Sequence, residues 1–264
     1  MKKMKSKIPL TSLSHTKIKY FSSLNSKKIR EKEGLFLIEG KKMVQEAIRE
    51  NIKLKAILTI ENEILDELKS QENLEIYLCK KEDIKKISCL ENPEGIIAVA
   101  SIFKNHSFPS NIKNHKYFVL DHIQDPGNLG TILRVCDAFG IQGVILHQCV
   151  DIYNPKVLRA SMGAIFRVPC YYTSIEKLIS YYPNQFAKTD MNGSPINLEN
   201  LDVYQFIVLG NEANGLVSQW NQIINKSITI PQIGNAESLN VGVASGILAW
   251  EWTKNQIKIL HSNF

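Results

Sequence analysis

The stretch Ile228–Trp252, ITIPQIGNAESLNVGVASGILAWEW, is the most informative part of this chain of 264 residues. A short β-branched run ends at Pro231, a polar loop follows, and the spacing of apolar residues predicts a helix from Val241 onward. Small residues that let another backbone approach closely recur along this helix: Gly242, Ser245, Gly246 and Ala249. A strand, a polar loop and a helix N-terminus in this order form a common ligand-binding edge in α/β proteins, although an ordinary strand–helix connection has the same pattern.

Two further segments have the same organisation. Tyr117–Gly140, YFVLDHIQDPGNLGTILRVCDAFG, begins with a short apolar strand, turns at DPGN and continues as a helix that ends at Gly140. Asn128 lies just ahead of this predicted helix, and Arg134 projects from its non-core face. Phe206–Leu216, FIVLGNEANGL, is a buried strand followed by an acid and two amides between glycines. Three strand ends therefore each carry an asparagine together with an arginine, a glutamate or a serine, which indicates one shared site.

These three segments resemble motifs 1, 2 and 3 of the SpoU (TrmH-type) branch of the SPOUT RNA methyltransferases. DPGNLGTILR matches motif 1, LGNEANGL matches motif 2 and IPQIGNAESLNVGVASGI matches motif 3, so the match runs from Lys116 to Leu260. The preceding Glu33–Ile48, EGLFLIEGKKMVQEAI, resembles the substrate-binding domain of many members. The resemblance implies an RNA (ribose-2′-O)-methyltransferase that uses S-adenosylmethionine, acts as a homodimer and modifies ribosomal RNA.

The resemblance also implies roles for individual motif residues. The cofactor-binding set is Leu209, Gly210, Gly215, Ile230 and Leu239. The catalytic set is Arg134, Glu212, Asn128, Ser238 and Asn240. A guanidinium stays protonated in proteins, so we expect Arg134 to orient the substrate and stabilise developing charge, with Glu212 holding Arg134 or accepting a proton. A structural role as a helix N-cap is the alternative for Asn128, Asn240 and Ser238.

Positive charge is concentrated at the N-terminus. Residues 1–33 contain ten Lys or Arg and two acids, whereas the whole chain has a formal charge of only +6. A basic arm suits contact with phosphates, and the candidate RNA-binding residues are Lys27, Lys28 and Arg30. Tyr20 and Phe21 lie within the arm and are candidates for stacking on bases. A solvated terminus without a ligand is the alternative.

Periodicity predicts two α/β domains, a substrate-binding domain at 34–100 and a catalytic domain at 116–264, with the basic arm at 1–33 and a polar linker at 101–115. The first has predicted strands Leu35–Ile38, Ala56–Leu58, Ile76–Leu78 and Ile96–Ala100, and helices Lys41–Glu50, Ile64–Lys69 and Asp83–Ile87. The second has predicted strands Tyr117–Leu120, Gly143–Leu146, Gln185–Ala187, Phe206–Leu209 and Ile228–Ile230, and helices Ile132–Phe139, Asn154–Ala160, Ile175–Tyr182 and Val241–Lys258. The resemblance implies a mostly parallel sheet with a deep trefoil knot, which no periodicity would predict.

Composition excludes several other classes of protein. The five cysteines show no metal-ligand spacing, so we expect reduced thiols in a cytoplasmic protein and no metal. No apolar run approaches the ~18 residues of a membrane span, and the basic start lacks the apolar core of a signal peptide. The glycine motifs of nucleotide-dependent enzymes are absent. Two alternatives stay open, namely a tRNA 2′-O-methyltransferase and a non-catalytic RNA-binding protein of the same fold.

Overall fold

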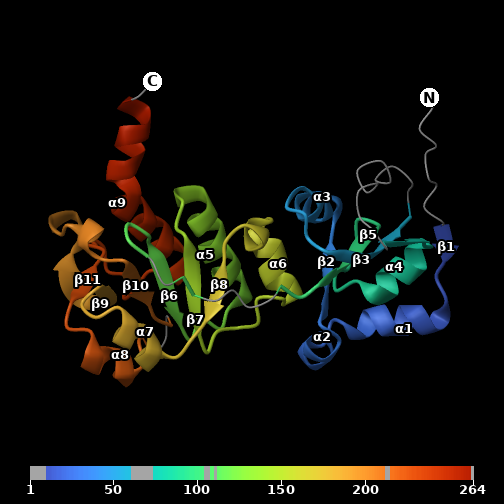
Figure 1. The fold of residues 1–264 in the computed structure, drawn as a ribbon, viewed down its shortest axis with the longest axis horizontal. Coiled ribbons are helices and arrows are strands. Elements are labelled where there is room, and N and C mark those ends of the chain that lie inside the picture. The colour runs from blue at the N-terminus through green and yellow to red at the C-terminus, as the bar shows by residue number, and fades with distance from the viewer. Residues whose placement is uncertain (1–9, 61–73, 104–107, 110–111, 212–214, 263–264) are drawn as a thin grey trace. The chain divides into compact units, whose positions relative to one another are not determined.

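The computed structural model describes residues 10–60, 74–103, 108–109, 112–211 and 215–262 (Figure 1). The chain divides into two compact units, and we describe each by itself. The first comprises Met1–Lys104 and Tyr153–Arg159, and the second comprises Asn105–Ile152 and Ala160–Phe264. The predicted helix Ile64–Lys69 and part of the predicted linker lie outside the described residues. Among the described helices, none is both long and apolar enough to cross a membrane.

The first unit is built on a five-stranded mixed sheet. Its spatial order is β1-β4-β3-β5-β2, where the strands are β1 (Leu10–Ser12), β2 (Leu35–Glu39), β3 (Leu54–Thr59), β4 (Glu75–Leu78) and β5 (Ile96–Ser101). Strand β5 runs antiparallel to both β2 and β3, whereas β1, β3 and β4 are parallel to one another. The helices of this unit are α1 (His15–Ser23), α2 (Lys27–Glu33), α3 (Lys41–Arg49) and α4 (Lys81–Ile87). The four strands and two of the helices predicted within this unit are confirmed.

The basic segment does not form an arm from residue 15 onward. It folds into α1 and α2, and Ile18, Phe21 and Leu24 are buried in the core of the first unit. The physical reason is that the apolar residues Ile18, Phe21 and Leu24 recur about once per helical turn, so they share one face that packs into the core of this unit. The lysines of α1 flank Ile18 in the sequence and stay on the charged face. The prediction of an arm over 1–33 is therefore wrong for residues 15–33, and Phe21 is not available to stack on bases.

The second unit is built on a six-stranded parallel sheet. The spatial order is β11-β9-β10-β6-β7-β8, where the strands are β6 (Tyr117–Asp121), β7 (Gly143–His147), β8 (Cys170–Tyr172), β9 (Phe186–Pro195), β10 (Phe206–Leu209) and β11 (Ser227–Thr229). Every neighbouring pair in this sheet is parallel. Strand β10 lies between β6 and β9 and is buried throughout, as expected for a continuous apolar run in a parallel sheet. The predicted α/β class with a parallel sheet is confirmed, and the knot stays a prediction.

Helices connect and cover these strands. They are α5 (Pro126–Phe139), α7 (Ile175–Tyr181), α8 (Ser218–Ile223) and α9 (Val241–Ser262), with short 3-10 turns η2 (Ala164–Phe166), η3 (Ile196–Leu198) and η4 (Leu201–Val203). Most of helix α6 (Pro155–Ser161) belongs to the first unit. Helices α5 and α9 lie side by side (Figure 1). Helix α5 begins at Pro126, earlier than the predicted Ile132, because Asp125 caps it: Asp125 Oδ1 accepts a hydrogen bond from the Asn128 amide at 2.8 Å.

Candidate active site

A cavity of about 500 Å³ opens at the carboxyl ends of β9, β10 and β11. Its walls come from the middle of β9, the loop after β10, the loop after β11 and the start of α9. This volume is typical of small-molecule sites, and this edge of a parallel sheet is where ligands bind in open α/β folds. The five residues expected to bind a cofactor all line this one cavity: Leu209, Gly210, Gly215, Ile230 and Leu239.

The lining of the cavity combines apolar surfaces with neutral polar groups. The apolar part includes Leu209, Ile228, Ile230, Leu239 and Leu248. The polar part includes Thr189, Asn192, Asn211, Asn221, Gln232 and Ser238. Asp190 is the single charged side chain among the described lining residues. The cavity can therefore take a ligand that has a flat apolar ring, several hydrogen-bonding edges and a positive charge.

The contribution of β9 to this cavity was missed by sequence reasoning. Thr189, Asp190 and Asn192 lie on β9 beyond the predicted strand Gln185–Ala187, which stops too early because the rest of β9 is mostly polar. Thr189 Oγ1 donates a hydrogen bond to the Val208 carbonyl at 3.0 Å, which ties this part of β9 to β10. Only the order of the strands in the sheet brings these side chains to the cavity.

Two glycines shape the loop after β10. A Cβ atom at Gly210 would lie 2.6 Å from the Gly215 carbonyl carbon and 2.8 Å from the Leu216 nitrogen, so only glycine fits there. The backbones of Asn211 and Gly215 exchange two hydrogen bonds, of 3.1 and 2.8 Å, and Gly215 has a left-handed φ of 62°. These bonds hold the two described ends of the loop together in the cavity wall. Glu212 belongs to it but lies outside the described residues, so its expected role stays a prediction.

An asparagine pair joins motif 1 to motif 3. Asn240 Oδ1 accepts hydrogen bonds from the amides of Gly242 and Val243 at 3.0 and 3.2 Å, which makes Asn240 the cap of α9. Its Nδ2 donates to Asn128 Oδ1 at 2.9 Å. The N-cap alternative is confirmed for Asn240 and wrong for Asn128, because Asp125 caps α5 instead. Ser238 is exposed and lines the cavity next to Leu239.

Arg134 is not brought into the cavity of its own chain. It lies on the exposed side of α5, and it is absent from the described residues that line the cavity. Asn128 and Asn240 join the first turn of α5 to the cap of α9, whereas Arg134 lies six residues further along α5. The structure of a single chain therefore brings together the cofactor set, Ser238 and the asparagine pair, and leaves Arg134 apart from them.

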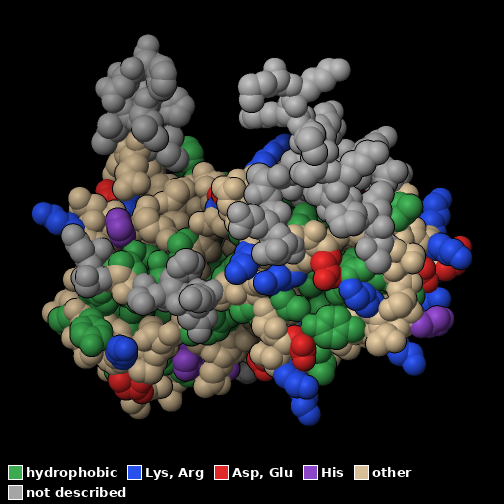
Figure 2. Space-filling view, turned by 45° about the vertical axis from the view of Figure 1, so that its right-hand side comes forward, with side chains coloured by type: hydrophobic (Ala, Val, Ile, Leu, Met, Phe, Trp, Pro, Cys, Tyr) green, Lys and Arg blue, Asp and Glu red, His purple; other side chains and the backbone are tan. Residues whose placement is uncertain are grey.

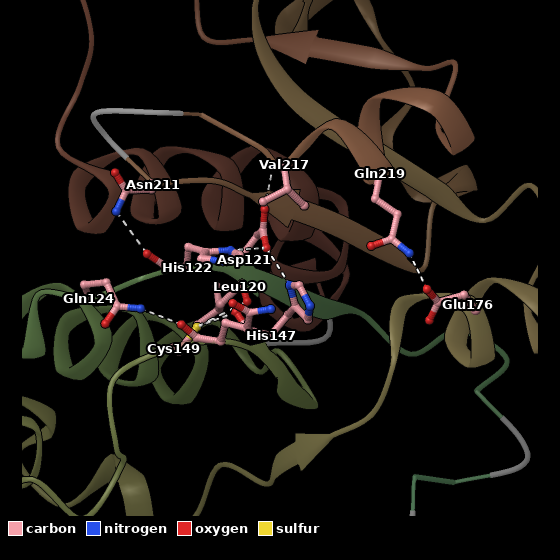
Figure 3. Close-up of polar contacts among 11 residues, drawn as sticks. Leu120, Asp121, His122, Gln124, His147, Cys149, Glu176, Asn211, Val217 and Gln219 are labelled. Carbon is pink, nitrogen blue, oxygen red and sulfur yellow. Dashed lines mark hydrogen bonds and ion pairs between the residues drawn. The ribbon is translucent and has the colours of Figure 1, made fainter.

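A buried carboxylate lies beneath the loop after β10 (Figure 3). Asp121, at the end of β6, is fully buried, and its Oδ1 accepts hydrogen bonds from His122 Nδ1 at 2.8 Å and His147 Nδ1 at 2.7 Å. Its Oδ2 accepts a hydrogen bond from the Val217 amide at 2.9 Å. Burial alone would raise the pKa of Asp121, but the bonds from His147, Val217 and His122 outweigh burial and hold that pKa below its usual value. Because an ionised carboxylate only accepts, both imidazoles carry their proton on Nδ1.

The same cluster fits a hydrogen-bonded arrangement better than a metal site. The ligand atoms of Asp121, His122 and His147 all lie within 4.8 Å of one another. Each Nδ1–Oδ1 separation is 2.7 to 2.8 Å, the length of a charge-assisted hydrogen bond. Zinc–nitrogen bonds of about 2.0–2.1 Å in a tetrahedral site would separate two ligand atoms by about 3.3 Å. We therefore assign protons, and no metal ion, to these positions.

The candidate RNA-binding residues lie on α2 of the first unit, and their environments differ. Lys27 and Lys28 are exposed, and Lys27 forms an ion pair with Glu31 at 3.7 Å. Arg30 is only 4% exposed, and its guanidinium donates hydrogen bonds to the carbonyls of Leu24 and Asn25 at 3.1 and 2.8 Å. The prediction that Arg30 contacts RNA phosphates is therefore wrong, because its buried side chain binds the carbonyls at the end of α1 instead. Figure 2 shows basic side chains alongside acidic ones on the face in view.

Comparison with known proteins identifies relatives of both units. Residues 115–250 match the SpoU rRNA Methylase family, and residues 15–98 match an MRM3-like substrate binding domain. A Bacillus subtilis relative, the 23S rRNA (guanosine(2553)-2′-O)-methyltransferase RlmP, is 29% identical over 91% of this chain and 97% of its own. The mitochondrial rRNA methyltransferase 3A of Danio rerio is 29% identical over 87% of this chain and 66% of its own.

A solved structure extends this likeness to the folded chain. The AdoMet-bound rRNA methyltransferase from Sinorhizobium meliloti is 26% identical and superposes with a TM-score of 0.82, covering 94% of this chain and 98% of its own. The match to an MRM3-like domain from residue 15 agrees with the finding that α1 and α2 belong to the first unit. The match to the SpoU rRNA Methylase family covers more than half of this chain, so the chain belongs to that family.

Proposed function

We propose that this protein transfers a methyl group from S-adenosylmethionine to a ribose 2′-hydroxyl of ribosomal RNA. The observation that carries the proposal is that one cavity gathers all five residues of the cofactor set, from two separate segments, the end of β10 with the loop after it and the loop after β11. The B. subtilis relative is named as a 2′-O-methyltransferase of 23S rRNA, and the S. meliloti relative was solved with AdoMet bound. Both support the proposal at modest sequence identity.

The cavity suits the chemistry of this cofactor. When bound, S-adenosylmethionine supplies an electrophilic methyl group on a positively charged sulfur. The side chains of Leu209, Ile230 and Leu239 provide apolar surface for the adenine ring, while neutral polar groups and main-chain atoms are available to its edges. Asp190 provides negative charge on the wall formed by β9. The tight turn at Gly210 keeps the loop after β10 close enough to close one side of the cavity.

The reacting hydroxyl needs orientation and a group that stabilises developing negative charge. We assign these tasks to Arg134 and the asparagine pair. The permanently charged guanidinium of Arg134 is suited to a phosphate or an oxyanion and not to removing a proton. Glu212 is the motif carboxylate that we assign to hold Arg134 or accept the proton. Asn128 and Asn240, bonded to each other at 2.9 Å, keep the two motif loops in register around the ribose.

A homodimer would complete this site. Three exposed apolar side chains lie at helical spacing on α9: Val243, Ile247 and Trp250, which are 54%, 38% and 53% exposed. Trp250 contacts Phe139 on the neighbouring α5, the helix that also carries Arg134. An exposed apolar stripe of this kind indicates an interface. We propose that a second copy covers it, so that Arg134 of one protomer works beside the cavity of its partner.

Three further parts of the proposal concern contact with RNA, location and the knot. Lys27 and Lys28 remain as exposed candidates for contact with RNA phosphates. We also propose a cytoplasmic location, because the spacing of the five cysteines in the sequence is typical of reduced thiols. The trefoil knot of the family is retained as part of the proposal, because the motif loops that would form it line the cavity.

The test is methylation of RNA by the purified full chain. Ribosomal RNA and tRNA from cells that lack the protein are incubated with methyl-labelled S-adenosylmethionine, and 2′-O-methylated positions are mapped in each. We expect label at one ribosomal position, and the same position should lose its methyl group in the cells without the protein. Label in tRNA alone would reassign the substrate. No transfer combined with no cofactor binding in calorimetry would favour a non-catalytic RNA-binding protein.

A further inference from the structure

The Asp121 cluster has no part in the proposed transfer reaction, and its burial needs a physical reason. A fully buried carboxylate loses the solvation of its charge, which is recovered only if donors surround it. Asp121 has three such donors, two imidazoles and the Val217 amide. An apolar side chain could occupy the end of β6 without any desolvation cost. The question is therefore what the carboxylate holds in place.

It holds one end of the loop that forms the cavity wall. Val217 directly follows Leu216, which lines the cavity, and its amide is bonded to Asp121 Oδ2 at 2.9 Å. The other end of the loop is bonded to His122, the residue that directly follows β6, because Asn211 Nδ2 donates a hydrogen bond to the His122 carbonyl at 3.0 Å (Figure 3). The dipeptide Asp121–His122 thus contacts the loop at Asn211, which forms the closing pair with Gly215, and at Val217, two residues beyond that pair.

The two imidazoles fix the carboxylate itself. His122 follows β6 and His147 ends β7, and both bond to the same oxygen of Asp121, which leaves the other oxygen for Val217. Two further titratable side chains act on this cluster among the described residues. The Cys149 thiol near Asp121 has its pKa raised to about 11, mainly by burial, so it stays neutral, and Glu176 interacts electrostatically with His147. Asp121 is therefore a carboxylate held by hydrogen-bond donors from the ends of two adjacent strands, β6 and β7.

We infer that Asp121, oriented by His122 and His147, is a positioning residue that fixes the described ends of the loop after β10, at Asn211 and at Gly215–Val217, where they line the cofactor cavity. The inference rests on the proposed function, because the ligand of that loop is S-adenosylmethionine. Asp121 does not touch the cofactor set directly, and acts through Val217 and Leu216. Loss of the anchor should therefore weaken cofactor binding and leave contact with RNA largely unchanged.

The experiment compares Asp121→Ala with a matched control, Asp137→Ala. Asp137 is also a carboxylate of the second unit with three hydrogen bonds, to Arg167 at 3.1, 3.1 and 2.8 Å, but it does not line the cavity. Calorimetry of the full chain with S-adenosylmethionine should show Kd raised about tenfold or more in Asp121→Ala, the factor expected when a bond to a charged acceptor no longer holds the loop. In Asp137→Ala the Kd should stay within about twofold of wild type, and the KM for RNA should change little in both.

Asp121→Asn provides a rescue that a purely structural role would not predict. The amide Oδ1 can still accept from Val217, while its two N–H groups can donate to the two imidazoles if both switch their proton to Nε2. We expect nitrogen NMR spectra to show this tautomer change and the Kd for S-adenosylmethionine to return to within about threefold of wild type. Asp121→Asn also keeps the inference testable if Asp121→Ala fails to fold.

Three results would overturn the inference. The first is equal cofactor affinity in Asp121→Ala and Asp137→Ala, and the second is an Asp121→Asn variant as weak as Asp121→Ala. The third is binding of Zn²⁺ by the wild type that removes the Nδ1 protons of His122 and His147. If the wild type binds no S-adenosylmethionine, the proposed function fails, and amide exchange then decides the inference alone: Val217 should be protected in wild type and Asp137→Ala and exposed in Asp121→Ala.

Discussion

Gly210→Ala should weaken cofactor binding through the shape of one loop. A Cβ atom at this position would lie 2.6 and 2.7 Å from the carbonyl carbon and oxygen of Gly215, and 2.8 Å from the Leu216 nitrogen. Ordinary van der Waals contact begins at 3.4 Å, and the opposing atoms belong to the backbone, so the two arms of the loop must separate. The hydrogen bonds between Asn211 and Gly215, at 3.1 and 2.8 Å, would then lengthen.

The magnitude follows from these contacts. Overpacking of a tight site costs about 1–3 kcal/mol, and each weakened backbone hydrogen bond costs about 0.5–1.5 kcal/mol. The two costs overlap, because the separation that relieves the overpacking is also what weakens the hydrogen bonds. We therefore expect a loss of about 2 kcal/mol in the binding free energy of S-adenosylmethionine, which corresponds to a Kd raised about 30-fold. Titration calorimetry measures this value, and circular dichroism checks that the variant is folded.

The matched control is Gly234→Ala in the loop after β11. No atom lies within 4 Å of a Cβ added there, so this substitution should leave the Kd within about twofold of wild type. A Gly210→Ala variant that binds S-adenosylmethionine within threefold of wild type would refute the reasoning, because the loop would then tolerate the separation that the distances require.

Four further predictions concern other parts of the molecule. Arg134→Ala should abolish detectable RNA methylation while the Kd for S-adenosylmethionine stays within about twofold, since Arg134 does not line the cavity; an active variant would remove Arg134 from the catalytic set. Asp190→Asn should weaken binding of S-adenosylmethionine about two- to fivefold and leave S-adenosylhomocysteine unaffected, because only the former carries the sulfonium charge; equal changes in the two Kd values would contradict this. The pKa of Asp121 in the folded protein lies below its ordinary 3.8, so the ionised Asp121 should stabilise the fold fully above pH 3.8 and lose this effect as the pH falls through the folded pKa. The difference in unfolding free energy between wild type and Asp121→Asn, measured by urea titration from pH 7 to pH 2, should therefore be constant at first and then shrink. A difference that is already falling at pH 6 would contradict the assignment. Arg30→Ala should lower the unfolding free energy by about 1–3 kcal/mol, whereas Lys28→Ala should change it by less than about 0.5 kcal/mol and reduce RNA affinity instead.

The sequence predicted the central strands and the motif loops well, because both depend on local pattern. Phe206–Leu209 is a continuous apolar run that can only be a buried strand in a parallel sheet, and it is β10. The ends of β10 and β11 bring their polar residues to one cavity as expected. Of the segment after β6, Asn128 reaches Asn240, whereas Arg134 does not line the cavity. The start of α5 was misjudged because its first turn, from Pro126, contains few apolar residues, and the helix depends on the Asp125 cap.

Other features could not be predicted because they depend on tertiary partners. The side chain of Arg30 has the same charge as Lys28, and only the carbonyls of Leu24 and Asn25 at the end of α1 distinguish a buried arginine from an exposed lysine. The role of Asp121 is similarly hidden, since its partners His147 and Val217 are 26 and 96 residues away in the sequence. No periodicity in the sequence reports such long-range hydrogen bonds.

The Asn128–Asn240 bond has a thermodynamic consequence. Asn240 belongs to the loop that leads from the cavity wall into α9, and Asn128 belongs to the turn that opens α5, so one hydrogen bond of 2.9 Å joins a ligand-binding wall to the helix that carries Arg134. If cofactor binding orders the first element, this bond can couple that ordering to the second element by at most the net energy of one hydrogen bond, about 0.5–1.5 kcal/mol. By linkage, an RNA that orders α5 must strengthen cofactor binding by the same factor. We therefore expect S-adenosylmethionine and RNA to bind cooperatively, with the hydrogen bond of the asparagine pair coupling their two sites.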